Sequence, residues 1–445
     1  MKLPSTKRFL KHFWQSQTAR VMFLTFVGLL IAWISDILLA AILGTSQTTD
    51  ALVIAVTLPR LVDTVAREGT RQSLVPLFIE RQDTDKRSKY YQFISGIVNL
   101  ALIIGVSLTV VVELLAPLIL ELIAPGLSVE GMSEAVLYLR LAAPTILFAP
   151  AIAILSVVLN SKKRFVVVAF RNALSPTFVI VAIILAQHWH KSVAPLTAFA
   201  YAISSAIFFI LVFFDARTIG YRHNWKIWIS KKDLVTLSMA GYWPTFGFAV
   251  RQIALMIKTL LLPSLAAVGG VSTVYFAQRI AFAIQTLVGV SIATTSLPAL
   301  TEYELAGNQS KLSSILWRSL LRSLIITAPF AVGISLFSKD IITIVYSRGS
   351  FESASIAQTS QIFIWLGLST VLISLIPIFE AVLYAKKAYK QVVLVMIGMA
   401  IFEVFLCWFL WQWYSLIGIA ASFLLSAITY TVVILVLSIK QLSHE

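Results

Sequence analysis

Long apolar runs recur from one end of this chain to the other, and they constrain its fold more than any other feature. Each run has roughly the 20 residues that an α-helix needs to cross the hydrocarbon core of a bilayer. Hydrophobic residues make up 59% of the sequence, and the mean hydropathy is +0.89. Backbone groups inside lipid must bond to one another, which a helix achieves within a single segment. The sequence therefore predicts an all-α polytopic membrane protein.

The apolar runs predict about twelve spans, arranged as two lobes of six helices. The first lobe covers 21–214 and the second 235–438, with a basic segment at 1–20, a linker at 215–234 and a tail at 439–445. The expected spans are 21–44, 51–78, 91–115, 135–159, 166–187, 193–214, 235–262, 271–300, 315–337, 357–384, 391–412 and 416–438.

The basic residues of the connections alternate along the chain. One set of loops, together with both tails, contains most of the loop lysines and arginines, whereas the opposite set contains Lys191, Lys339 and Arg348. By the positive-inside rule, both termini are expected in the cytoplasm. The net charge of +15 is thus a topology signal, and no nucleic-acid partner is expected. Because Cys407 is the single cysteine, neither an intrachain disulfide nor a cysteine metal site is expected.

Three short matches between the two halves occur in the same order and at a nearly constant offset. They pair SLVPLF with TSLPAL, LELIAPG with ITIVYSRG, and VLNSKKRF with VLYAKKAY. An even number of spans per half gives the halves the same orientation. We expect a pseudo-twofold axis along the membrane normal, with the cargo site between the lobes. The offset makes Asp36 equivalent to Lys258, and these opposite charges are a candidate coupling pair.

The second predicted span carries a stripe of ionisable residues. Arg60, Asp63, Arg67 and Arg71 fall within a sector of about 80° on a helix, and Glu68 lies beside it. A charge at the bilayer centre costs at least about 2.5–3.5 kcal/mol, so the stripe must face water or internal partners. One interpretation is a structural ladder Arg60–Asp63–Arg67; the other, which we favour, is the wall of a substrate pathway.

Further ionisable residues lie in the other spans. Arg251 and Lys258 are seven residues apart and share a helix face, and Arg279 lies in the eighth span. The acidic residues deep in spans are Asp36, Asp63, Glu68, Glu380 and Glu403. The sequence contains no phosphate loop and no hydrolase or metal motif, so we expect no enzyme activity, no cofactor and no metal site. Transport would draw on a cation gradient, the membrane potential or consumption of the cargo outside.

The stripe lies within TDALVIAVTLPRLVDTVAREGTRQSLVPLF, which resembles the hallmark motif of the MurJ/MviN family. AQRIAFAIQTLVGVSIATTSLPAL and YSRGSF are similar to two further motifs of that family. The family belongs to the multidrug/oligosaccharidyl-lipid/polysaccharide exporter superfamily. The resemblance implies two six-helix lobes that flip a lipid-linked cell-wall precursor by alternating access.

Matched by position, the family residues in this chain are Asp36, Asp50, Glu68–Gly69 and the cavity arginine Arg279. Leu29, Ser35 and Asp63 stand where the family has arginines, and the family's two extra C-terminal spans are missing. We expect Arg60, Arg67, Arg71, Arg251 and Lys258 to rebuild a cationic cavity around Arg279, with Asp36, Asp63 and Glu68 in coupling or gating.

These features predict a flippase in the bacterial cytoplasmic membrane for an undecaprenyl-pyrophosphate-linked saccharide. Arginine binds a diphosphate through charge-assisted, often bidentate hydrogen bonds. The cargo is either lipid II or an exopolysaccharide or O-antigen repeat unit, and the glycan-synthesis machinery of the envelope is the candidate protein partner. The alternatives are a MATE-like cation-coupled drug antiporter, which normally needs acidic sites, and a scaffold that transports nothing.

Overall fold

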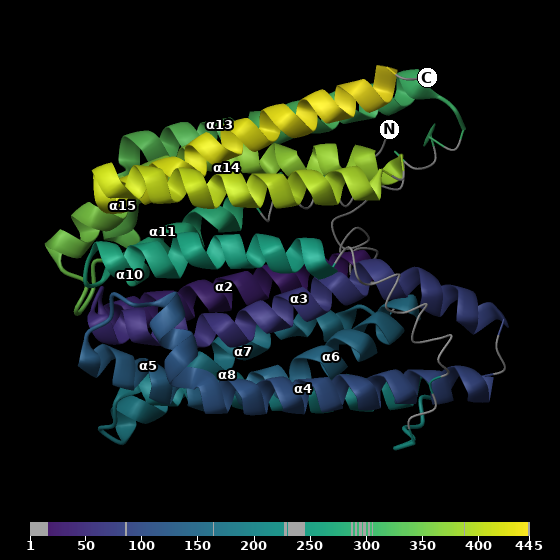
Figure 1. Cartoon of the computed structure of the whole chain (residues 1–445), viewed down its shortest axis with the longest axis horizontal. Helices are drawn as coiled ribbons and strands as arrows, with labels where there is room; N and C mark the ends of the chain where they lie inside the picture. Colours follow the sequence, from purple (N-terminus) through teal and green to yellow (C-terminus); the bar gives the residue numbers. More distant parts are fainter. Residues whose placement is uncertain are drawn as a thin grey trace, which may run out of the picture. The chain divides into compact units, whose positions relative to one another are not determined.

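The computed structural model describes residues 17–84, 87–162, 164–226, 229, 245–285, 288–289, 292, 296, 300, 303–304, 306–386 and 388–443. These residues form helices joined by short connections (Figure 1). The helices are α2 (Gln17–Leu43), α3 (Gln47–Thr84), α4 (Arg87–Ile123), α5 (Val129–Ala142), α6 (Pro144–Ser161), α7 (Val166–His188), α8 (Val193–Thr218), the π-helix η1 (Ile257–Leu261), α10 (Leu262–Ala266), α11 (Gly270–Gln285), α13 (Gln309–Tyr346), α14 (Ser353–Ala385) and α15 (Tyr389–Ser443).

In the described part of the chain, 9 helical stretches are long and apolar enough to cross a membrane. The 38-residue helix α3 has the length, but its charged stripe lowers its apolar content. The chain is therefore an all-α, multi-pass membrane protein, as the apolar runs predict.

The 55-residue helix α15 contains a sharp break. Ser415 has non-helical angles, with φ of 50° and ψ of −131°. A side chain at Gly418 would collide with the carbonyl of Leu410, so the chain turns back tightly at this point. Figure 1 shows the two halves of α15 as separate rods. The break lies between the two predicted spans 391–412 and 416–438, so α15 supplies two membrane-length segments.

The described residues divide into two compact units. The first comprises those up to Leu39, those of Ile54–Leu122 and those of Val129–Phe248. The second comprises those of Ala40–Val53, Ile123–Ser128 and Ala249–Glu445. The second unit thus includes the turn between α2 and α3, which the sequence assigns to the first lobe.

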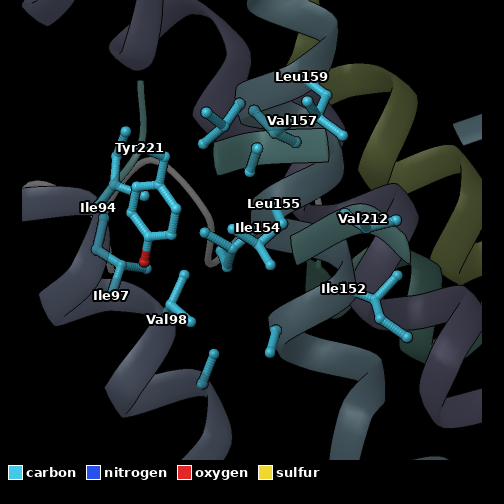
Figure 2. Packing of buried hydrophobic residues seen from close by; sticks show 14 of the residues in the cluster. Ile94, Ile97, Val98, Ile152, Ile154, Leu155, Val157, Leu159, Val212 and Tyr221 are labelled. Atoms are coloured by element: carbon cyan, nitrogen blue, oxygen red, sulfur yellow. The ribbon is translucent and has the colours of Figure 1, made fainter. Parts of the chain in front are cut away.

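The core of the first unit brings α4, α6 and α8 together. Ile94, Leu155 and Val212 are among its buried residues (Figure 2). Tyr221, from the segment after α8, packs into the same core beside α4. Hydrogen bonds fix that segment, because the hydroxyl of Tyr91 donates to the carbonyl of Ile219 at 2.8 Å. The residues that follow α8 are therefore part of the first unit's packed core.

In the second unit, α13, α14 and α15 pack side by side (Figure 1). Leu316, Phe379 and Ile434 represent the three helices in the buried core. Gly289 lies against the backbone of Ser374, and a Cβ there would come within 2.6 Å of its carbonyl oxygen. The small residues predicted to allow close helix approach around 289–296 therefore do so at Gly289.

Candidate substrate and coupling sites

The charged stripe of α3 makes its described contacts within the first unit. The guanidinium of Arg60 lies 5.3 Å from the centre of the Tyr201 ring on α8. Arg67 contacts Glu68 at 3.7 Å between Nη1 and Oε1, and 41% of its side chain is exposed. The side chain of Arg71 lies outside the described part of the structure. Arg60 and Arg67 are therefore partly accessible cations on one helix.

Asp63 forms an ion pair with Arg171 of α7. Arg171 also places its guanidinium 5.4 Å from the centre of the Phe208 ring on α8. This pair corrects the expected ladder, in which Asp63 would bridge Arg60 and Arg67, because Asp63 bonds across to another helix. It also gives Arg171, which the sequence suggested would reach toward a span end, an internal partner.

In the second unit, a buried carboxylate holds Arg251. Oε1 of Glu380 lies 4.0 Å from Nη1 of Arg251 and accepts a hydrogen bond of 2.9 Å from the hydroxyl of Tyr430. The side chain of Glu380 is 13% exposed, whereas that of Arg251 is 40% exposed. The carboxylate is thus fixed on two sides, while the guanidinium keeps donors free to meet a ligand.

Arg279, the cation that matches the family motif, lies on α11 and is half-buried. Its guanidinium is 5.6 Å from the centre of the Tyr275 ring, one helical turn earlier. An aromatic face restrains a guanidinium without using its hydrogen-bond donors. The donors of Arg279 therefore keep the planar geometry that suits phosphate oxygens.

Lys258, expected among the cargo-binding cations, is buried and 1% exposed. Its ammonium lies 3.3 Å from Oε2 of Glu403 on α15. Direct contact between Lys258 and a cargo would require this ion pair to open. The hypothesis that Lys258 pairs with Asp36 in one state of the cycle competes with the same pair. Asp36 itself is buried in the first unit, at 3% exposure.

The turn 40–53 is fastened within the second unit by hydrogen bonds. The backbone N–H of Ser350 donates to the carbonyl of Ala41 at 2.7 Å, and the hydroxyls of Thr45 and Ser355 bond at 2.5 Å. Gly349 has a φ of 57° and lies against Ala41. A glycine is needed there because a side chain would meet that carbonyl.

Asp50 caps α11 from the first turn of α3, ahead of the predicted span 51–78. Its Oδ1 accepts from the backbone N–H of Ser272 at 2.7 Å, at the positive end of α11. Burial raises the pKa of the Asp50 carboxyl from 3.8 to about 6, against the hydrogen bonds, which lower it. A proton on Asp50 is therefore held more tightly in the folded protein than in the unfolded chain.

This shift makes stability depend on pH. The raised pKa contributes stability below about pH 4, and the contribution is lost as the pH rises through about 6. Asp50→Asn removes the titration, so we expect wild type to lose thermal stability relative to Asp50→Asn between pH 4 and 7. The measurement is Tm against pH in detergent, with the exposed Asp340→Asn as control. A constant Tm difference between wild type and Asp50→Asn would contradict the expectation.

Sequence reasoning named the charged residues but missed the partners that hold them. Tyr201, Tyr275 and Tyr430 all contact charged side chains, and nothing in their local sequence marks them. Arg171 carried a signal, because it is an arginine inside a predicted span. The described residues contain no group of three or more His, Cys, Asp and Glu side chains that could hold a metal ion. What they do provide is several half-exposed guanidinium groups, which suit an anionic ligand.

Comparisons with known proteins agree with this fold. A solved lipid II flippase MurJ in an inward closed conformation superposes with a TM-score of 0.83, covering 95% of this chain and 88% of that one at 22% identity. An inward-facing multidrug resistance MATE transporter gives a TM-score of 0.77 at 14% identity, covering 96% of this chain and 95% of that one. The chain therefore has a MurJ/MATE-like fold.

Sequence relatives and a family model identify the family. A lipid II flippase MurJ of Burkholderia cenocepacia is 26% identical over 385 residues, which is 82% of this chain and 72% of the relative. A probable lipid II flippase MurJ of Rhizobium meliloti is 27% identical over 80% of this chain and 68% of its own length. The family model "Lipid II flippase MurJ" matches residues 39–445. This chain belongs to the lipid II flippase MurJ family.

Proposed function

We propose that this protein moves an undecaprenyl-pyrophosphate-linked saccharide from the inner to the outer leaflet of the bacterial cytoplasmic membrane. The observation that carries the proposal is the family match over residues 39–445. The protein would be a transporter without enzyme activity, working by alternating access between two six-helix lobes. The cargo is lipid II or a related polyprenyl-linked repeat unit, and the enzymes that make and consume it are the candidate partners.

The positions of the arginines support an anionic cargo. Arg60, Arg67, Arg251 and Arg279 are each half-buried, with part of the guanidinium reachable. Arg279 is held by an aromatic ring and Arg251 by a buried carboxylate, so both are positioned before a ligand arrives. A diphosphate offers oxygens for two or more bidentate contacts with such groups. We assign the same role to Arg71, whereas Asp63 and Glu68 limit the local positive charge and Asp36 is a coupling candidate.

The proposed topology has twelve spans with both termini in the cytoplasm. In a Cys407→Ser background, cysteines at Lys86, Lys163, Arg222 and Lys387 should be shielded from an impermeant thiol reagent added outside intact cells. Cysteines within 45–50, 126–130 and 263–270 should react. Labelling after permeabilisation controls for buried positions. Reaction of both sets from the outside would refute the twelve-span topology.

Replacement of an essential flippase tests the cargo in cells. We expect this chain to restore growth to a bacterium depleted of its own lipid II flippase, and Arg279→Ala to fail at equal membrane abundance. Growth restored equally by both would contradict the role of Arg279. An abundant wild-type protein that does not restore growth would exclude lipid II and leave the other polyprenyl-linked repeat units as cargo.

The MATE-like fold also supports a second candidate, a cation-coupled antiporter for organic cations. An organic cation would bind to acidic side chains. Asp63 and Glu380, however, are already bonded to Arg171 and to Arg251 and Tyr430. Uptake of an organic cation by reconstituted vesicles, with no movement of a pyrophosphate lipid, would favour this candidate over the flippase.

A further inference from the structure

We propose that Glu403, with Lys258 as its fixed counter-ion, is a proton-binding site that couples transport to a proton gradient. The inference rests on the proposed function and adds the identity of the coupling ion and its site. Both residues belong to the second unit, Lys258 on η1 and Glu403 on α15.

The Lys258 ammonium is surrounded on all sides by protein groups. It lies 3.3 Å from Oε2 of Glu403, 3.4 Å from the hydroxyl of Ser426 and 3.8 Å from the centre of the Phe423 ring. These three contacts use the three N–H donors of the ammonium. Glu403 precedes the break in α15, and Phe423 and Ser426 follow it. One lysine therefore links both halves of α15 to η1.

A purely structural explanation accounts poorly for this pair. Removing two charges from water costs more than packing two apolar side chains of similar volume, so a buried ion pair is a poor way to hold helices together. Ionisable groups inside membrane spans usually mark ion or proton pathways. Lys258 also lies in a π-helix, a geometry that often occurs at functional sites because it can revert to α-helix. The position and its local geometry both favour a working site.

Exposure identifies Glu403 as the group that exchanges the proton. The side chain of Glu403 is 25% exposed, whereas that of Lys258 is 2% exposed. Water can therefore reach the carboxylate without reaching the ammonium. The other titratable group next to the pair, among the described residues, is the buried thiol of Cys407. The carboxylate of Glu403 is thus the counter-charge of Lys258.

Proton uptake by Glu403 changes the charge balance of the site. The carboxylate takes one proton from water on one side and becomes a neutral acid, so the Lys258 ammonium loses its counter-charge. An uncompensated buried ammonium is unstable, which favours a conformation in which the pair opens. Release of the proton to the other side restores the pair. No bond other than O–H is made or broken, and nothing is oxidised or reduced.

The test is flipping of a polyprenyl-pyrophosphate lipid by full-length protein in vesicles, with a pH gradient of one unit imposed in either direction. A gradient of one unit changes the driving force for one proton about tenfold. We expect one direction to accelerate flipping by wild type several-fold and the other to slow it. Lys258→Met combined with Glu403→Gln keeps the volume and removes the charges, so its rate should ignore the gradient. Arg140→Met combined with Glu113→Gln, an exposed pair on the first unit, is the matched control and should respond as wild type does.

Two results would overturn the proton site while leaving the flippase intact: a wild-type rate that ignores the gradient, or a double variant that keeps the full response. If wild type moves no pyrophosphate lipid, the proposed function fails and thermal unfolding decides the proton site separately. We then expect the Tm of wild type to fall relative to that of the double variant as the pH decreases, because protonation breaks the pair only in wild type. Parallel Tm profiles would overturn the inference.

Discussion

Replacing Arg279 by alanine is expected to weaken binding of a polyprenyl-pyrophosphate lipid by more than about tenfold, because each hydrogen bond to a charged group contributes about 1.5–3 kcal/mol. The Tyr275 ring restrains this guanidinium without using its donors. Arg279→Lys keeps the charge but loses the planar fork, so its affinity should lie between those of alanine and wild type. The measurement is binding of the lipid to purified protein across a range of salt concentrations.

The matched control for Arg279 is Arg318→Ala. Arg318 is an exposed arginine of the same unit, so its loss removes one charge without altering the α11 site. Equal affinity in Arg279→Ala and wild type would contradict the proposed cargo contact. An equal loss in Arg318→Ala would reduce the effect to general attraction between the protein's positive charge and an anionic lipid.

The second large effect is expected at Asp63, where a carboxylate and Arg171 lie together inside the first unit. Their side chains are 12% and 22% exposed. Asp63→Ala leaves the guanidinium without its counter-charge, and we expect the free energy of unfolding to fall by about 3 kcal/mol. Adding Arg171→Met should recover part of this loss, because no unpaired charge then remains. Chemical denaturation in detergent measures all three variants as a double-mutant cycle.

Glu113→Gln is the control for Asp63, since the Glu113–Arg140 pair is long, at 4.0 Å, and largely exposed. Its loss should change stability by less than about 1 kcal/mol. Additive losses for Asp63 and Arg171 would mean that the pair contributes nothing as a pair. Asp63→Asn should leave lipid binding at least as strong as in wild type, because it removes a negative charge near Arg60 and Arg67.

The helical architecture could be predicted from the sequence because each membrane span is a local pattern. The predicted spans 166–187 and 193–214 correspond to α7 and α8, and the boundary between 412 and 416 coincides with the break at Ser415. The charged face of α3 could also be predicted, since helical spacing alone places its residues on one stripe.

Which charge pairs with which could not be predicted, because pairing depends on contacts between distant segments. Asp63 has cations at helical spacing on its own helix, yet it bonds to Arg171 of α7. Lys258 was matched with Asp36 by repeat position, but its ion pair is with Glu403, 145 residues away in sequence. The signals present in the sequence were the ionisable residues themselves. The π-helix that carries Lys258 has no sequence pattern of its own.

The central claim is tested most directly by movement of a defined polyprenyl-pyrophosphate saccharide across the membrane of vesicles that contain only this protein. Lipid II and a repeat-unit lipid would be compared with a dioleoyl phospholipid, and an enzyme added outside would detect each saccharide as it appears. We predict that at least one pyrophosphate lipid crosses much faster than in protein-free vesicles and that Arg279→Ala slows it severely. Rates equal to those of protein-free vesicles for every pyrophosphate lipid, from protein that is folded and inserted, would contradict the account.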